Sequence, residues 1–154
     1  MRTNRGFTLV ELAVVTSIIV TLLGFITINL VRSQQTASLN SVEEILLADL
    51  KQQQLKAMIG DTEGRVISDP YGIHFDQTKY TLFHGAYSAG DISNSVINLD
   101  SSMKFNNSGF NVICSKLKGE IPAATIIELQ DNTNSKLKRI HLNIYGTVTQ
   151  VESL

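Results

Sequence analysis

This chain of 154 residues has one cysteine, two prolines and almost no net charge. A lone cysteine, Cys114, cannot form a disulfide within the chain, so the fold does not depend on a disulfide framework. Both prolines lie beyond residue 60, and a proline kink is therefore not expected in a helix formed by the N-terminal part. The formal net charge of −1 gives no strong field that would attract nucleic acid or an anionic membrane surface.

The sequence also lacks the motifs of common enzyme classes. It has no Ser-His-acid order, no glycine-rich phosphate loop and no HExxH zinc motif. The acidic residues Glu43, Glu44 and Glu63 are interpreted as solvated helix and turn charges rather than as an acid–base pair. We therefore expect no enzymatic activity and no cofactor.

Two stretches contain groups that can bind metals, and each has a simpler interpretation. His74 and Asp76 can share one strand face, where a metal would need His141 as a further ligand. We favour a histidine that is packed or solvated on the surface of a sheet. Residues 131–134, with the sequence Asp-Asn-Thr-Asn, offer oxygens to Ca²⁺ but lack the charge of a tight site, which favours a plain turn. We expect no metal site.

The most prominent feature that is present is an apolar stretch from Phe7 to Val31. As a helix rising about 1.5 Å per residue it extends to roughly 37 Å, which exceeds the ~30 Å hydrocarbon core of a bilayer. The stretch is therefore predicted to span a membrane. Arg2 and Arg5 in the short leader favour a cytoplasmic N-terminus, with the rest of the chain on the other side of the membrane.

Glu11 is the single charged residue of this apolar stretch. A carboxylate near the bilayer centre costs about 2.5–3.5 kcal/mol on insertion scales, so it normally has a partner. No Lys, Arg or His lies between Phe7 and Val31, and the stretch cannot supply that partner from its own side chains. A secretory signal would place its cleavage site after the apolar region, whereas here the small residue Gly6 stands before it.

Residues 6–12, with the sequence Gly-Phe-Thr-Leu-Val-Glu-Leu, resemble the class III signal of type IV pilins and type II secretion pseudopilins. In that family a membrane peptidase cleaves after the glycine and methylates the new N-terminal phenylalanine. The resemblance implies cleavage between Gly6 and Phe7, N-methylation of Phe7, and a role in filament assembly for Glu11. The carboxylate of Glu11 would neutralise the terminal amine of a neighbouring subunit. The alternative is a plain membrane anchor with a chance match.

The remainder of the chain favours a minor subunit within this family. Many pilins close a C-terminal loop with a disulfide, and a chain whose only cysteine is Cys114 departs from that pattern. We expect Cys114 to be a small buried apolar residue. A long helix that ends at Gly60-Asp61, two aromatic strands and a closing hairpin around Gly146 together resemble the H-type minor pseudopilins.

One helix is predicted from about Thr8 to Ile59, and its second half carries an apolar stripe at helical spacing. We call this set the packing stripe: Leu39, Val42, Leu46, Leu50 and Ala57. The opposite face, expected to be solvated, carries Glu43, Glu44, Lys51, Gln52 and Lys56. Ser41 to Glu44 also fits a capping box that would restart a helix, and this alternative stays open. Gly60-Asp61 predicts the C-terminal end of the helix.

After Asp61 the apolar pattern alternates, which predicts short strands separated by polar turns. The predicted strands are 71–75, 80–83, 96–99, 103–105, 110–114, 124–129, 138–145 and 147–152. The expected class is α+β with a pilin-like fold, in which a long helix packs on a pair of antiparallel sheets or a small sandwich. The predicted organisation is a leader (1–6), a transmembrane half (7–31) and an amphipathic half (32–60) of the helix, and a β-rich domain (61–154).

The main functional hypothesis is a minor pseudopilin of a type II secretion system. The chain would cross the bacterial inner membrane once, with its C-terminal domain outside the cytoplasm. Its partners would be prepilin peptidase, other pilin-like subunits and secreted cargo. The alternative is a minor type IV pilin for pilus assembly, adhesion or DNA uptake, and the third hypothesis is a membrane-anchored enzyme. DNA uptake needs a basic surface, for which the candidates are Lys136, Lys138 and Arg139 with Lys116 and Lys118. Because these charges are few, nucleic acid is not an expected partner.

Overall fold

The computed structural model describes residues 8–133 and 135–154, apart from the side chains of residues 25–36. The chain divides into two compact units, residues 1–38 and residues 39–154. Helix α1 (Leu9–Ile59) runs through both of them. The prediction of one uninterrupted helix is confirmed, and Ser41 lies inside that helix rather than at a second helix start.

Helix α1 ends at Ile59, directly before Gly60, as the sequence predicts. Gly60 adopts a φ of +65°, a left-handed conformation that glycine reaches without steric cost. Its N–H donates to the carbonyl of Ala57 (3.3 Å), and the N–H of Asp61 donates to the carbonyl of Lys56 (3.0 Å). This pair of bonds is a Schellman motif, which satisfies carbonyls that a helix end leaves without partners.

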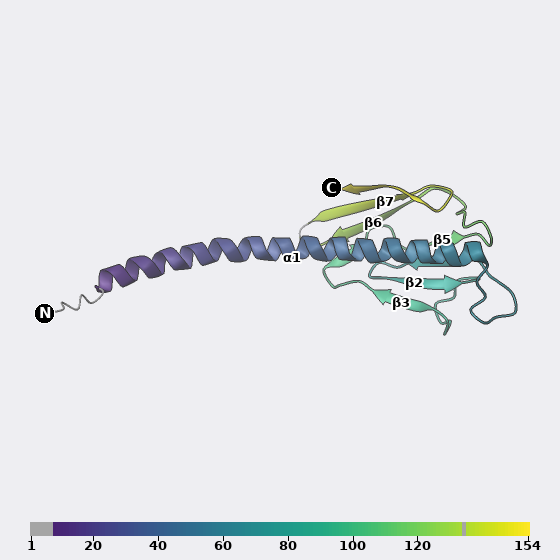
Figure 1. Cartoon of the computed structure of the whole chain (residues 1–154), viewed down its shortest axis with the longest axis horizontal. Coiled ribbons are helices and arrows are strands. Elements are labelled where there is room, and N and C mark those ends of the chain that lie inside the picture. The colour runs from purple at the N-terminus through teal and green to yellow at the C-terminus, as the bar shows by residue number, and fades with distance from the viewer. Residues whose placement is uncertain (1–7, 134) are drawn as a thin grey trace. The chain divides into compact units, whose positions relative to one another are not determined.

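The strands of the second unit form two antiparallel sheets (Figure 1). The first sheet has the order β3-β2-β1-β5 and the second has the order β4-β6-β7-β8. The strands of the first sheet are β1 (Tyr71–Phe75), β2 (Lys79–His84), β3 (Ser95–Asn98) and β5 (Phe110–Cys114). Those of the second sheet are β4 (Met103–Phe105), β6 (Thr125–Asp131), β7 (Lys136–Leu142) and β8 (Val148–Ser153). The α+β prediction is confirmed.

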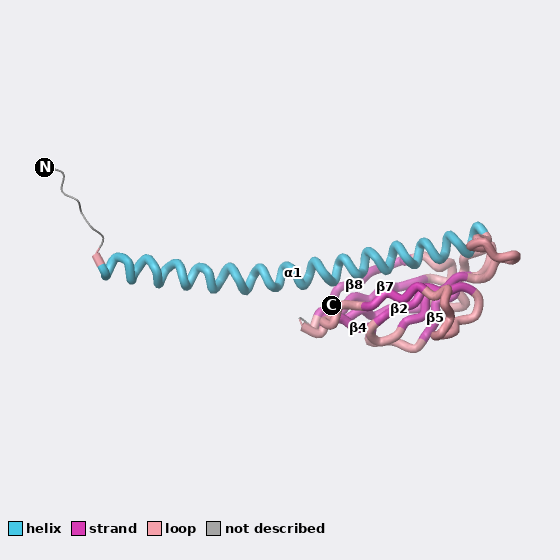
Figure 2. The backbone as a smooth tube through the Cα atoms, turned by 90° about the horizontal axis from the view of Figure 1, so that it is seen from below, coloured by secondary structure: helices cyan, strands magenta, loops and turns pink. Residues whose placement is uncertain are grey.

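Residues 39–59 of α1 lie along the strands of both sheets, as Figure 2 shows from another side. Four residues of the packing stripe are buried, and Val42 is half-buried against the same core. The sheets contribute alternate residues, as a strand with one buried face must. These include Tyr71, Ile73 and Phe75 from β1, Ile127 and Leu129 from β6, and Ile140 and Leu142 from β7. The rings of Phe75 and Phe105 pack edge to face, with 5.1 Å between their centroids, and connect the two sheets.

Polar contacts also tie the helix to each sheet. The hydroxyl of Tyr80 in β2 donates to Asp49 at 2.6 Å. Lys138 in β7 pairs with Glu43 at 2.6 Å, and both side chains are largely shielded from solvent. The expectation that Glu43 lies on a solvated face was therefore wrong, because it sits beside the packing stripe within reach of a strand lysine. Lys56, expected on that face as well, is half-buried and pairs with Glu63.

Several strand boundaries differ from the prediction by a few residues. Strand β7 ends at Leu142 rather than Tyr145, because Asn143 begins the turn: its Oδ1 accepts from the N–H groups of Tyr145 and Thr147. Gly146 stands in this turn with a φ of +70°. Strand β6 continues to Asp131, where it pairs with Lys136 of β7. The turn at Asn143 therefore sets the end of β7, and cross-strand pairing sets the end of β6.

Candidate functional site

The first described residues form a reciprocal cap at the start of α1. The hydroxyl of Thr8 accepts from the backbone N–H of Glu11 at 3.2 Å and donates to the Glu11 carboxylate at 3.2 Å. The backbone N–H of Thr8 donates to the same Oε2 at 3.4 Å. This arrangement is a capping box, in which two residues three apart satisfy each other's free N–H groups. It holds the carboxylate of Glu11 at the positive end of the helix dipole.

The helix that follows presents apolar side chains to its surroundings. Its exposed large apolar residues are Leu9, Val10, Leu12, Val14, Val15, Ile18, Ile19, Val20, Leu22 and Leu23. The hydroxyls of Thr16, Ser17 and Thr21 donate to carbonyls of the preceding turn, so they are satisfied within the helix. Among residues 8–24, Glu11 is the one charged side chain, and no described Lys, Arg or His pairs with it. A carboxylate without a counter-charge among the described residues could be stabilised in an apolar environment by a cation from elsewhere.

Gly6 and Phe7, the predicted cleavage and methylation positions, lie outside the described residues. Within the part of the chain that the structure describes, no helix is both long enough and apolar enough to cross a membrane.

The structure separates the histidines that sequence reasoning considered for a metal. His74 in β1 contacts Asn111 (2.6 Å) and Asp76 (3.3 Å), and its ring stacks on Tyr87 at 3.9 Å. His141 lies in β7 of the other sheet, where its nearest carboxylate belongs to Glu152. Within residues 8–133 and 135–154, no group of three or more His, Cys, Asp or Glu is placed to hold a metal ion.

The range 131–134 forms a turn in the part that the structure describes. Asp131 is buried at the end of β6, and its Oδ1 accepts from the N–H of Thr133 at 2.8 Å. Asn134 lies outside the described residues. The Asp131 carboxylate thus accepts a backbone hydrogen bond within the turn, which agrees with the interpretation of this range as a plain turn.

Two of the five basic residues considered for DNA binding carry an acidic partner. Lys138 pairs with Glu43, and Arg139 pairs with Glu128 at 2.7 Å. Each pair cancels a positive charge that a phosphate contact would need. Lys116 and Lys118 are exposed in the loop after β5.

Cys114 is a free, buried thiol at the end of β5, as predicted. Burial raises the pKa of this thiol to about 11. The thiolate is the nucleophile and the metal ligand, and a buried thiol with a raised pKa stays neutral at pH 7. Cys114 therefore packs as a core residue.

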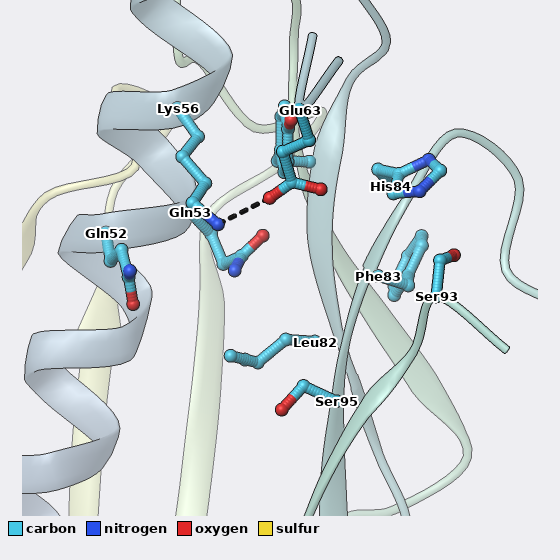
Figure 3. Close-up of a pocket in the computed structure, with 10 residues that line it drawn as sticks. Gln52, Gln53, Lys56, Glu63, Leu82, Phe83, His84, Ser93 and Ser95 are labelled. Atoms are coloured by element: carbon cyan, nitrogen blue, oxygen red, sulfur yellow. Dashed lines mark hydrogen bonds and ion pairs between the residues drawn. The ribbon is translucent and has the colours of Figure 1, made fainter. Parts of the chain in front are cut away.

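A polar pocket of about 220 Å³ opens between the C-terminal part of α1 and the first sheet (Figure 3). Helix α1 contributes Gln52, Gln53 and Lys56, and the chain beyond it contributes Glu63, Tyr71, Leu82, Phe83, His84, Ser93 and Ser95. Lys56 and Glu63 form an ion pair of 2.6 Å across the pocket. The side chain of Gln53 is 4 % exposed, and its Oε1 has no hydrogen-bond partner among the described residues.

Residues 1–27 match a family model, the prokaryotic N-terminal methylation motif. The chain carries a type IV prepilin-like signal. The matched range includes Gly6, Phe7 and Glu11, and the motif indicates a structural subunit that prepilin peptidase processes and that assembles with other pilin-like subunits. No curated protein and no solved structure gives a significant match to the chain.

Sequence reasoning assigned no role to two residues that the structure brings forward. Thr8 caps the helix and holds Glu11, and the signal was visible as Thr-x-x-Glu at the start of an apolar run. Gln53 lies between Leu50 and Ala57 of the packing stripe, and its helical spacing from both places it on the buried face. Because Gln53 is polar, a pattern defined by apolar residues does not include it.

Proposed function

We propose that this prepilin-like chain is a minor pseudopilin of a type II secretion system. Anchored in the bacterial inner membrane through residues 7–31, it would join a pseudopilus at or near its tip, with residues 61–154 outside the cytoplasm. The observation that carries the proposal is Glu11, a lone carboxylate held by Thr8 on an otherwise apolar, exposed helix.

The proposed chemistry at Glu11 is charge pairing between subunits. Cleavage after Gly6 would create an amine at Phe7, and residues four apart lie about one helical turn from each other. In a bundle of such helices, the Glu11 carboxylate meets the amine of a neighbour that is slightly displaced along the axis. Two unpaired charges in an apolar bundle are costly, whereas a pair is tolerated. Glu11 therefore selects the axial offset between subunits.

Features of the second unit support a minor, non-adhesive role. Cys114 is buried and free, so the chain has no disulfide-closed C-terminal loop of the kind found in many pilins. The acidic partners of Lys138 and Arg139 weaken the basic surface that DNA uptake would need. A surface without a strong net charge fits contacts with other tip subunits or with secreted cargo.

Replacement of Glu11 tests the assembly role. We expect Glu11→Ala to insert and to be cleaved after Gly6, yet to be absent from sheared pseudopili, because an unpaired amine would remain in the bundle. Glu11→Asp, shorter by one methylene, should incorporate partially. The measurement is the amount of the variant that sediments with sheared filaments, together with secretion in a strain that carries only that copy.

Glu44→Ala is the matched control, because Glu44 is an exposed glutamate of the same helix in the other unit. It should assemble and support secretion as the unmodified chain does. Normal incorporation and secretion of Glu11→Ala would refute the assembly role. If a strain with Glu11→Ala secreted normally but lost DNA transformation, that result would instead favour the alternative, a minor type IV pilin.

A further inference from the structure

Strand β3 forms one edge of the first sheet, and its outer side has no partner strand (Figure 1). The N–H of Leu99 donates to the carbonyl of Thr78 at 2.9 Å, which continues the register that pairs β3 with β2. Bonded and non-bonded positions alternate along an antiparallel pair. Val96 and Asn98 therefore direct their N–H and C=O groups away from the sheet, and no group of the described residues bonds to either N–H.

This edge lacks most of the features that keep another chain from pairing with an exposed strand. Natural edge strands are commonly protected by a proline, a β-bulge or a charged side chain. Residues 92–99 contain no proline and no charge, and the pairing of β3 with β2 shows no register shift. Val96 is 50 % exposed, and Ile92 in the preceding turn is fully exposed. The open groups and the apolar side chains together fit an added strand.

A carboxylate stands in the turn at each end of β3. The N–H of Ser93 donates to Asp91 at 2.9 Å, and the N–H of Ser102 donates to Asp100 at 3.0 Å. These bonds lower the pKa of both carboxyl groups, which are therefore ionised at neutral pH. Among the described residues, no Lys or Arg forms an ion pair with either carboxylate.

These charges argue against a second copy of the chain as the added strand. In an antiparallel pair of β3 strands, Asp91 of one copy would lie near Asp100 of the other, and in a parallel pair each carboxylate would lie near its own counterpart. Like charges at facing positions destabilise strand pairing. A strand with a cation at each end would instead be attracted.

We propose that the open edge of β3 receives an extended segment of a partner protein, with uncharged β-branched residues in its middle and Lys or Arg at both ends. Its backbone bonds to the N–H and C=O groups of Val96 and Asn98, as in β-strand addition. Its basic ends pair with Asp91 and Asp100. The edge lies within residues 39–154, and the proposal is independent of the role of Glu11.

The probe is the peptide acetyl-Lys-Thr-Val-Thr-Val-Thr-Lys-amide, titrated into the full-length, isotope-labelled chain in detergent micelles. NMR follows the backbone amides of Val96 and Asn98. We expect saturable shifts of both signals and slower hydrogen exchange of both N–H groups, because an added strand removes them from water. N-methylation of the three central residues of the peptide removes donors on both of its edges but keeps its side chains and charges, and it should abolish binding.

Val96→Pro removes an outward N–H and no bond to β2, a position at which edge strands tolerate proline. It should keep the fold and abolish binding. The matched control is Ser153→Pro in β8, the edge strand of the other sheet. Leu137 and Leu154 exchange backbone bonds, so the neighbouring Ser153 also directs its N–H away from its sheet. Ser153→Pro should bind the peptide as the unmodified chain does.

A second variant tests the charges without a change in the backbone. Asp91→Asn combined with Asp100→Asn keeps an acceptor for each turn and removes both charges. It should weaken binding of the peptide by at least about twofold, as expected for the loss of exposed ion pairs. A peptide with Glu in place of both Lys residues should bind the unmodified chain more weakly than the parent peptide and should gain affinity for this variant.

Five results would overturn the proposal. They are no saturable shift with the parent peptide, equal binding of the N-methylated peptide, unchanged binding by Val96→Pro, unchanged binding by the double Asn variant, and loss of binding by Ser153→Pro. The last result would assign the peptide to the edge of β8. A dimer of the chain that Val96→Pro abolishes would also refute the proposal, because it would assign the edge of β3 to a second copy.

Discussion

Gly72 stands in the middle of β1, where the chain leaves no room for a side chain. A Cβ at this position would lie 2.7 Å from Cζ of Phe83 and 2.8 Å from the carbonyl oxygen of Val112. Phe83 is the direct cross-strand partner of Gly72, and its ring covers the face that the glycine leaves open. Tyr87 packs on Phe83 at 5.2 Å and continues this aromatic cover towards His74.

We therefore predict that Gly72→Ala lowers the free energy of unfolding by about 1–3 kcal/mol, the usual cost of overpacking. Urea denaturation of the full chain in micelles measures it. Gly90→Ala is the matched control, because its Cβ would meet nothing within 4 Å, and it should change stability by less than about 0.5 kcal/mol. Equal effects of the two substitutions would contradict the close contact at Gly72.

Cys114 gives a second prediction at the residue scale. Because burial keeps its pKa at about 11, iodoacetamide at pH 8 should label the native chain far more slowly than the urea-unfolded chain. The raised pKa also makes the contribution of Cys114 to the free energy of unfolding depend on pH. In the unfolded chain the thiol ionises near its ordinary value of 9.0, so its contribution is present below that pH and is lost as the pH rises towards 11.

The pH dependence is measured as the difference in unfolding free energy between the unmodified chain and Cys114→Ala. That difference should shrink between pH 9 and pH 11. Rapid labelling of the native chain at pH 8 would show that the thiol is accessible. A difference that stays constant or grows with pH would contradict the raised pKa.

At the scale of the element, the second part of α1 is the common support of both sheets. Leu46 is 0 % exposed and lies at the centre of the packing stripe. Tyr80 and Lys138 reach α1 from opposite sheets and bond to Asp49 and Glu43. Burial and the hydrogen bond to Asp49 raise the pKa of the Tyr80 hydroxyl, which therefore stays protonated and acts as the donor. Apolar packing and these polar ties place this part of α1 against both sheets.

Leu46→Ala should cost about 2–5 kcal/mol of unfolding free energy, the range for a buried leucine. The neighbouring Ile45 is 53 % exposed, and Ile45→Ala should cost far less, which makes it the matched control. A fragment that begins near Ser33 is predicted to be monomeric and to unfold cooperatively, and it provides the sample for both measurements. A change below about 0.5 kcal/mol for Leu46→Ala would place Leu46 on the surface.

Local patterns predicted most elements because their signals lie within a few residues. The spacing of Leu39, Leu46 and Leu50 indicated the buried face of α1, and Gly60-Asp61 indicated its end. Pairings between distant residues were not accessible in this way. Strand β4 follows β3 in the chain but pairs with β6 in the other sheet, which depends on long-range contacts. For the same reason the partnership of Glu43 with Lys138 could not be read from a helical pattern that expected Glu43 in solvent.

In the candidate site, too, local features could be predicted from the sequence and contacts between distant residues could not. Glu11 was visible as a lone acid in an apolar run, and the matched methylation motif covers the same residues. The pocket beside Gln53 joins α1 to residues from Glu63 to Ser95, so no short motif marks it. Gln53 Oε1 lacks a donor among the described residues, and this appears only when its spatial neighbours are known.

At the scale of the whole molecule, the proposed function requires that the chain is converted into a mature subunit. Cleavage after Gly6 would create the amine that Glu11 is proposed to neutralise, and methylation would modify the same nitrogen. If Gly6 is the cleavage position, Gly6→Val should leave the leader attached. Thr8→Val removes the hydroxyl that caps α1 but leaves Gly6 and Phe7 unchanged, so it should still be cleaved and serves as the control.

The most direct test is the intact mass of the chain extracted from membranes of cells that contain prepilin peptidase. We predict a mature chain that begins at an N-methylated Phe7, and a full-length precursor when the peptidase is absent. A chain that begins at Thr8 or later, that is cleaved beyond residue 25, or that keeps its leader in the presence of the peptidase would contradict the account.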